Sequence, residues 1–280
     1  MSALKTAQLR PRVFLAGAVL ALAAIVLAGA SGSASAKNQL GGGVRPTIVL
    51  LHGDWADASS WTSVLERLQG KGYTVVAPPN PLRGPTEDAP YVSSYLQTIT
   101  GPIVLVAHSY GGFVATNAAT GNPNVKALVY IDAFVPDEGD TLLDLTTTGK
   151  SCITQDALNP VPFDGGIDLY LRWGPNGDYA GYTQCFANGV SPKQSAVLFA
   201  EQRPASAAQF SEPSGPPAWK TIPSWALMGT QDHVIPLALQ EQMTTRAGSH
   251  VSTVDAGHLS LITNPDQVTK TILTAVKATS

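Results

Sequence analysis

Six short apolar runs, separated by stretches with helical spacing, constrain the fold of this chain more than any other feature. The runs cover residues 47–51, 74–77, 103–107, 125–134, 225–228 and 252–254. Strands that are apolar on both faces and alternate with helices form parallel sheets that are covered on both sides. The sequence therefore predicts an α/β fold with a six-stranded, mostly parallel sheet and helices on both faces. Because right-handed crossovers bring the carboxyl ends of such strands to one edge, we expect a functional site at that edge.

The segment between the fourth and fifth runs interrupts this alternation. It is rich in Gly, Pro, Asp and Asn, and it contains only short helical patterns, such as that over residues 193–202. We predict a cap over residues 137–218, inserted after the fourth core strand, and a core formed by residues 37–136 and 219–280. The alternative interpretation is a disulfide-stapled surface loop that does not act as a lid.

The N-terminus has the pattern of an export signal. A positively charged start precedes an apolar run over residues 13–30, and Ala34-Ser35-Ala36 then forms a small-residue cleavage pattern. We expect residues 1–36 to be a signal peptide whose removal leaves a secreted, periplasmic or extracellular, protein without stable membrane association. The alternative is a retained anchor, because an apolar run of this length can just span a bilayer.

Cysteine content and charge limit the remaining possibilities. Cys152 and Cys185 both follow the predicted signal peptide, and an isolated pair in an oxidising compartment usually forms one disulfide, which we predict here. Two buried thiols are the alternative. Charged residues make up 13% of the chain and the formal net charge is −3, so we expect no nucleic-acid partner.

Ser109 stands where an apolar run meets a helical stretch, in the sequence Ala107-His108-Ser109-Tyr110-Gly111. Small residues two before and two after a serine permit the sharp strand-to-helix turn of a nucleophile elbow. Such a pattern usually begins with Gly, and this chain has Ala instead. In this strand–helix context the pattern predicts that Ser109 is a nucleophile, and an ordinary turn serine is the alternative.

A serine nucleophile needs a base and, behind the base, a carboxylate. Of the five histidines, His258 follows the last apolar run and can reach the predicted site edge, so we predict that it is the base. Asp232, which follows the fifth run, is the favoured carboxylate. Asp132, at the end of the fourth run, is its competitor, and otherwise a pocket residue or a buried structural group.

Acyl transfer also needs hydrogen-bond donors for the oxyanion. We predict the backbone N–H groups of Tyr110, directly after the nucleophile, and of Asp54, directly after a His-Gly pair. An ordinary strand-to-helix loop is the alternative at Asp54. No metal or cofactor is expected for this chemistry. The candidate pocket residues, each also explicable as core, are Trp55, Asp132, Phe134 and Leu259.

Four motifs, LHGDW, AHSYGG, GTQDHVIP and GHLSL, occur in the order found in the α/β-hydrolase superfamily, which this chain resembles. The sequences VYIDAFVPDEGDTL and PAWKTIPSWALMGTQD are similar to those of small bacterial secreted hydrolases related to plant methyl esterases and hydroxynitrile lyases. The resemblance implies a catalytic triad of Ser109, Asp232 and His258. Plant lyases carry a lysine directly after the catalytic histidine, and Leu259 at this position argues against lyase chemistry.

The favoured function is that of a carboxylesterase, which cleaves a small-molecule ester through an acyl-Ser109 intermediate. The same triad also serves lactonases, amidases, cofactor-free haloperoxidases and hydroxynitrile lyases, so these remain alternatives. A third hypothesis is a binding module that keeps the scaffold but leaves the triad idle.

Overall fold

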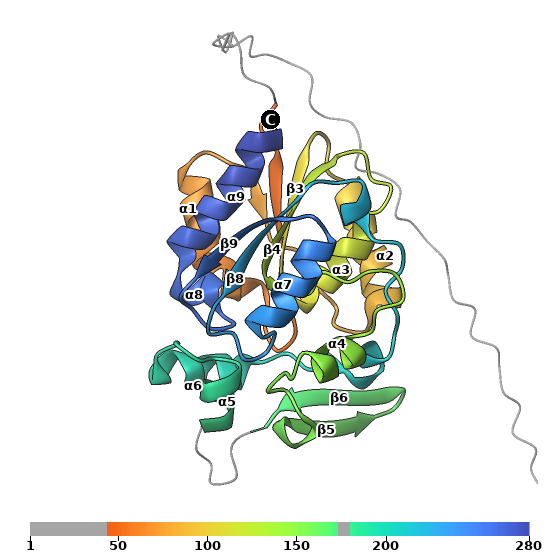
Figure 1. Cartoon of the computed structure of the whole chain (residues 1–280), viewed down its shortest axis with the longest axis vertical. Helices are drawn as coiled ribbons and strands as arrows, with labels where there is room; N and C mark the ends of the chain where they lie inside the picture. Colours follow the sequence, from red (N-terminus) through yellow and green to blue (C-terminus); the bar gives the residue numbers. More distant parts are fainter. Residues whose placement is uncertain (1–43, 173–179, 280) are drawn as a thin grey trace, which may run out of the picture. The chain divides into compact units, whose positions relative to one another are not determined.

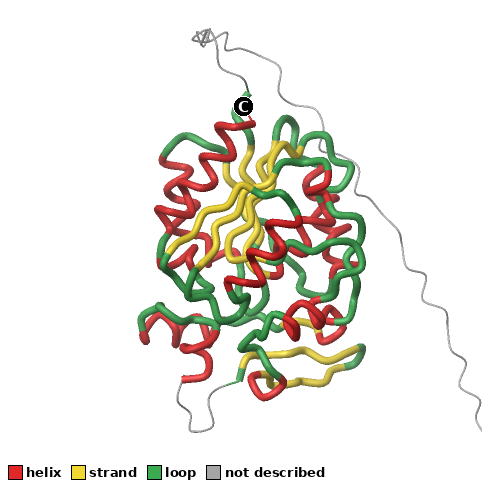
Figure 2. Tube along the Cα trace, viewed as in Figure 1, coloured by secondary structure: helices red, strands yellow, loops and turns green. Residues whose placement is uncertain are grey.

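The computed structural model describes residues 44–172 and 180–279 (Figures 1 and 2). The predicted signal peptide, residues 1–36, lies outside the described residues. Within the described part of the chain, no helix is long and apolar enough to cross a membrane.

A six-stranded sheet forms the centre of the fold. Its strands lie in the order β2-β1-β3-β4-β8-β9, and every neighbouring pair is parallel. This confirms the predicted α/β architecture. β3 is buried along its whole length, as is expected for an interior strand covered on both faces. The strands are β1 (Thr47–Leu51), β2 (Val75–Val76), β3 (Ile103–Ser109), β4 (Val125–Ala133), β8 (Ser224–Gly229) and β9 (His250–Val254).

Helices cover both faces of this sheet (Figure 1). α9 packs on β3, β4 and β8 and pairs with α1, whereas α3 packs on β1, β3 and β4 and pairs with α2. α7 contacts β8. The elements of these layers are η1 (Ala58–Trp61), α1 (Thr62–Gly70), α2 (Pro85–Gln97), α3 (Tyr110–Ala118), α7 (Leu237–Arg246), α8 (Ser260–Thr263) and α9 (Pro265–Thr279).

The chain between β4 and β8 forms a second, three-stranded antiparallel sheet in the order β5-β6-β7, which the sequence analysis did not expect. β5 lies at its edge, where Pro160 and Pro162 are tolerated, and most of its residues are exposed. The elements of this segment are α4 (Leu142–Thr148), η2 (Gln155–Ala157), β5 (Leu158–Phe163), β6 (Gly166–Leu171), α5 (Ala180–Cys185), α6 (Pro192–Glu201), β7 (Ala205–Ser206), η3 (Ala207–Phe210) and η4 (Ala218–Lys220).

This second sheet contacts the loops that follow β1 and β2. The indole N–H of Trp55 donates to the carbonyl of Leu169 in β6 at 2.9 Å. Arg83 pairs with Asp168, also in β6, at 2.8 Å between Nη1 and Oδ1. The inserted segment is therefore anchored at the carboxyl edge of the central sheet, the edge at which the functional site is expected.

Candidate active site

Ser109 is the last residue of β3, and α3 begins at the next residue. Its backbone has φ 54° and ψ −128°, a sparsely populated conformation for a residue with a side chain. A Cβ on Gly111 would lie 2.8 Å from the carbonyl oxygens of Leu51 and His52. The glycine lets α3 begin this close to β1, and the sharp turn leaves Ser109 at the carboxyl edge.

Three side chains that are far apart in sequence form a continuous hydrogen-bonded chain at this edge. Oγ of Ser109 lies 3.0 Å from Nε2 of His258. Nδ1 of the same imidazole lies 2.9 Å from Oδ2 of Asp232. All three residues are buried. The structure thus brings together the residues that the sequence analysis selected as nucleophile, base and acid.

The carboxylate of Asp232 is held by four donors. Oδ1 accepts from the backbone N–H groups of Val234 at 2.8 Å and Ile235 at 2.9 Å, and Oδ2 accepts from Nε2 of Gln240 at 3.0 Å as well as from His258. Burial raises the pKa of Asp232, while the two backbone donors oppose that rise because they stabilise the anion. Sequence reasoning missed Gln240, since its contact depends on the orientation of α7.

Asp132 occupies a different position from the one that a catalytic acid would need. Its Oδ1 accepts from the backbone N–H of Gly229 at 2.7 Å, and its Oδ2 accepts from both the backbone N–H and the hydroxyl of Ser260. Both nitrogens of His258 already have other partners. Asp132 therefore connects the chain before Asp232 to the chain after His258, in the manner of a buried structural group.

The imidazole of His258 is enclosed by other rings. Burial lowers its pKa from 6.5 to about 3, which keeps the ring neutral in the resting protein. The His108 ring lies 4.7 Å away between centroids, and its Nε2 donates to the carbonyl of His258 at 2.8 Å. His108, which directly precedes Ser109, thus holds the loop that carries His258, a contact that the sequence analysis missed.

The residues that precede the two predicted oxyanion donors pack closely against each other. Gly53 precedes Asp54, and Ser109 precedes Tyr110. A Cβ on Gly53 would lie 2.5 Å from Cβ of Ser109 and 3.1 Å from its Oγ. The side chain of Asp54 accepts from Nε2 of Gln209 at 2.7 Å, and the hydroxyl of Tyr110 donates to Asp88 at 2.7 Å. These bonds fix the side chains of the two residues whose backbone N–H groups were predicted to face the oxyanion.

The remaining pocket candidates are all buried. Trp55 contacts Phe186 edge to face at 5.8 Å between centroids, and Phe186 in turn lies 5.4 Å from the ring of His258. Phe134 directly follows β4, and Leu259 directly follows the base. Phe186 comes from the inserted segment and was not selected from the sequence, where nothing distinguishes it from an ordinary core aromatic residue.

A cavity of about 990 Å³ lies beside Phe186. Its lining includes Tyr182, Phe186 and His233 together with the disulfide-bonded pair Cys152 and Cys185. The disulfide agrees with the predicted pairing. Phe186 faces this cavity and also contacts the imidazole, so the inserted segment supplies the residue between the cavity and the base.

Comparison with protein families assigns the fold to one group. Residues 48–271 match the alpha/beta hydrolase family. The chain belongs to this family. The membership accounts for the parallel sheet and for the sharp strand-to-helix turn that carries Ser109 at the end of β3 in this alpha/beta hydrolase.

Individual relatives are more distant. The carbendazim hydrolyzing esterase of Nocardioides sp. (strain SG-4G) is 31% identical over 111 residues, a match that spans 35% of this chain and 46% of that protein. A pyrethroid hydrolase from Sphingobium faniae has a similar structure, with a TM-score of 0.67 and 21% identity over 83% of this chain and 98% of that one. Polyneuridine aldehyde esterase gives a TM-score of 0.67 and 18% identity, over 82% and 99% of the two chains.

Proposed function

We propose that this alpha/beta hydrolase is a carboxylic ester hydrolase that works through an acyl-Ser109 intermediate. The observation that carries the proposal is the continuous hydrogen-bonded chain from Ser109 Oγ through His258 to Asp232, at 3.0 Å and 2.9 Å. A neutral imidazole between a hydroxyl and a buried carboxylate is the arrangement that converts serine into a nucleophile.

In the first half-reaction, Nε2 of His258 takes the hydroxyl proton as Ser109 Oγ attacks the ester carbonyl carbon. Asp232 accepts the Nδ1–H bond and stabilises the imidazolium that results. The tetrahedral intermediate collapses when the C–O bond to the alcohol breaks and His258 returns its proton to the departing alkoxide. In the second half-reaction, water attacks the acyl-serine with the same base, which releases the carboxylic acid and restores the Ser109 hydroxyl.

The negative charge of each tetrahedral intermediate is assigned to the backbone N–H groups of Tyr110 and Asp54. Loss of one such donor typically costs roughly 3 kcal/mol of transition-state stabilisation. The proximity of Gly53 to Ser109 supports this assignment, because the N–H of Asp54 belongs to the peptide unit that directly follows Gly53.

The names of relatives support ester cleavage as the reaction. The Nocardioides relative is an esterase that hydrolyses carbendazim, the Sphingobium neighbour is a pyrethroid hydrolase, and a further neighbour is polyneuridine aldehyde esterase. We extend only the reaction class to this chain and propose a small-molecule ester as substrate. In the same proposal, residues 137–218 form the cap that selects the ester.

The proposed reaction is tested with p-nitrophenyl esters of increasing acyl length and with a fluorophosphonate that labels activated serines. The wild-type chain is expected to hydrolyse the short esters, and mass spectrometry is expected to locate the phosphonate on Ser109. The variant Ser109→Ala should lose at least about 10³-fold in kcat, because acylation has no other nucleophile.

Ser249 provides a matched control, because its hydroxyl also has a hydrogen-bond partner but lies at the opposite end of the sheet, beside Ser224 at the start of β8. Ser249→Ala should keep wild-type activity. Ester turnover that survives in Ser109→Ala would contradict the proposal, as would a labelled but catalytically silent wild-type chain.

We propose further that the enzyme is exported and that residues 1–36 are removed. The Cys152–Cys185 disulfide supports this, because disulfides persist chiefly in oxidising compartments. After expression of the full chain in a bacterial host that secretes protein, N-terminal sequencing of the exported product should begin at Lys37. A product that starts at Met1 and stays in the membrane fraction would instead indicate a retained anchor.

A further inference from the structure

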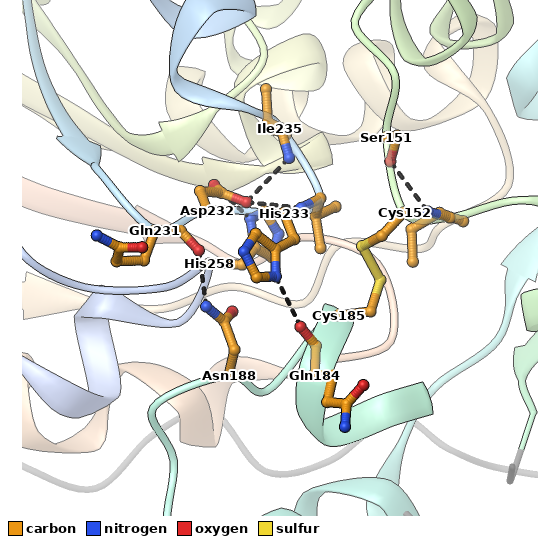
Figure 3. The surroundings of a disulfide bond; sticks show 12 residues. Ser151, Cys152, Gln184, Cys185, Asn188, Gln231, Asp232, His233, Ile235 and His258 are labelled. Carbon is orange, nitrogen blue, oxygen red and sulfur yellow. Dashed lines mark hydrogen bonds and ion pairs between the residues drawn. A yellow bond between two sulfur atoms is a disulfide. The ribbon is translucent and has the colours of Figure 1, made fainter. Parts of the chain in front are cut away.

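The inserted segment reaches into the loop that carries the acid of the triad (Figure 3). Asn188, three residues beyond α5, donates from Nδ2 to the carbonyl of Gln231 at 2.7 Å. Gln231 directly precedes Asp232. A side chain from outside the core therefore fixes the peptide unit that leads into the catalytic carboxylate.

The same side chain also contacts the residue before the base. A Cβ placed on Gly257 would overlap the amide group of Asn188, so the amide packs directly on the backbone that leads into His258. The amide of Asn188 thus contacts the residues that precede both members of the acid–base pair. A change in its position would therefore act on both loops at once.

On its other side, the acid loop is held by the residues around the disulfide. His233 directly follows Asp232, and its carbonyl accepts from the backbone N–H of Cys152 at 2.9 Å. Its Nδ1 donates to the carbonyl of Gln184, the neighbour of Cys185, at 2.7 Å. Figure 3 shows both cysteines beside the acid loop, with the side chain of Asn188 directed at Gln231 and the backbone carbonyl of Gln184 directed at His233.

The covalent bond between Cys152 and Cys185 joins the two strips of chain that make these contacts. Without this disulfide, the segment that contains Gln184 and Asn188 would be held to the segment that contains Cys152 by noncovalent contacts alone. The core supplies its own support to Asp232 through Gln240. The inserted segment adds a second support, which acts on the backbone of the loop instead of on the carboxylate.

We infer that Asn188, fastened by the Cys152–Cys185 disulfide, is a positioning residue that sets the geometry of the Asp232–His258 pair. The inference rests on the proposed function, because it assumes that this pair activates Ser109. It assigns to the cap a part in the chemical step in addition to any part in substrate selection.

The test compares Asn188→Ala, the double variant Cys152→Ser/Cys185→Ser and the wild-type protein. Four quantities are measured: kcat and KM for a p-nitrophenyl ester, the second-order rate of fluorophosphonate labelling of Ser109, and the proton resonance of His258 Nδ1–H. Gln202→Ala is the matched control, because Gln202 also bonds backbone groups in the inserted segment but does so at Leu171 and Phe199, away from the acid loop.

Displacement of a reacting group by about 1 Å can lower a rate by 10²-fold. In Asn188→Ala we expect a smaller displacement of the Asp232–His258 pair, which should lower kcat and the labelling rate by roughly tenfold. KM should stay within about twofold, because a positioning residue acts on the chemical step and not on uniform binding of substrate. The Nδ1 proton resonance should shift or broaden. The double cysteine variant should change in the same direction, and Gln202→Ala should match the wild type.

Unchanged kcat, labelling rate and resonance in Asn188→Ala would overturn the inference, as would a rise in KM alone. If the wild type is labelled but cleaves no ester, the proposed function fails while the labelling rates still decide on Asn188. If the wild type is not labelled, the Nδ1 resonance decides, because it reports on the Asp232–His258 hydrogen bond in the resting protein.

Discussion

At the scale of single residues, Asp132 and Asp232 show how neighbouring carboxylates acquire different tasks. Both are buried at the carboxyl edge, Asp132 in β4 and Asp232 just beyond β8. Asp232 faces Nδ1 of His258, whereas Asp132 accepts from Gly229 and Ser260. Residue type and position in the sequence favoured Asp232 and left Asp132 as its competitor, and the direction of each side chain now separates the two.

His52 gives a residue-scale prediction about stability. Its Nδ1 donates to the carbonyl of Gly53 at 2.9 Å, and its Nε2 accepts from the backbone N–H of Asn80 at 2.9 Å. Burial lowers its pKa from 6.5 to about 4. A group whose pKa is depressed in the folded state takes up its proton first in the unfolded chain, so stability falls as the pH drops from 6.5 towards 4.

This one histidine should lower the free energy of unfolding by about 2 kcal/mol between pH 7 and pH 5, since the unfolded chain binds the proton over most of this range and each such pH unit costs about 1.4 kcal/mol. His52→Gln removes the titrating group. Urea unfolding at both pH values should therefore show that the stability advantage of the wild type over His52→Gln shrinks by that amount at pH 5. An advantage that is equal at the two pH values would show that His52 takes up its proton equally in both states.

At the scale of elements, the close approach of α3 to β4 is the feature on which the position of Ser109 depends. A Cβ on Gly112 would overlap the carbonyl oxygen of Phe134 and lie 2.9 Å from Cβ of Ala133. The helix cannot accept a side chain at this position without moving away from the strand. Because α3 begins directly after Ser109, such a movement would also displace the nucleophile.

Gly112→Ala is therefore expected to lower the free energy of unfolding by about 1–3 kcal/mol, the usual cost of overpacking, and to reduce kcat. Thermal or urea unfolding and ester turnover measure the two effects. Gly70→Ala, in α1, is the control, because a Cβ there meets no atom within 4 Å. Equal stability of the two variants would mean that α3 moves without cost.

The elements of the central sheet were the predictable part of the fold. The six apolar runs became β1, β2, β3, β4, β8 and β9, because buried parallel strands carry an uninterrupted apolar signal. The hairpin of β5 and β6 carries no such signal, since it is largely exposed and contains Pro160 and Pro162. The local sequence signal for this hairpin is its two-residue turn, Asp164-Gly165, which favours the pairing of β5 with β6.

At the scale of the whole molecule, the three central residues of the site were predictable from the sequence, whereas the residues packed around them were not. The order of Ser109, Asp232 and His258 follows from strand succession, so the sequence predicted which residues meet. Gln240, Phe186 and Asn188 reach the site through tertiary packing of α7 and of the inserted segment. Their positions depend on helix orientation and on a disulfide closed across a separation of 33 residues, neither of which a local pattern encodes.

The contact of Asn188 with the acid loop bears on how enzymes of this kind diversify. If caps were independent modules, a chimera with a foreign insertion between β4 and β8 would inherit new selectivity and keep its turnover number. Here the inserted segment holds the loop that leads into Asp232. A chimera whose insertion lacks an amide at this position should therefore gain new selectivity but have a lower turnover number. A recombinant that preserves the Asn188–Gln231 contact and the two cysteines is expected to accept a new insertion without that loss.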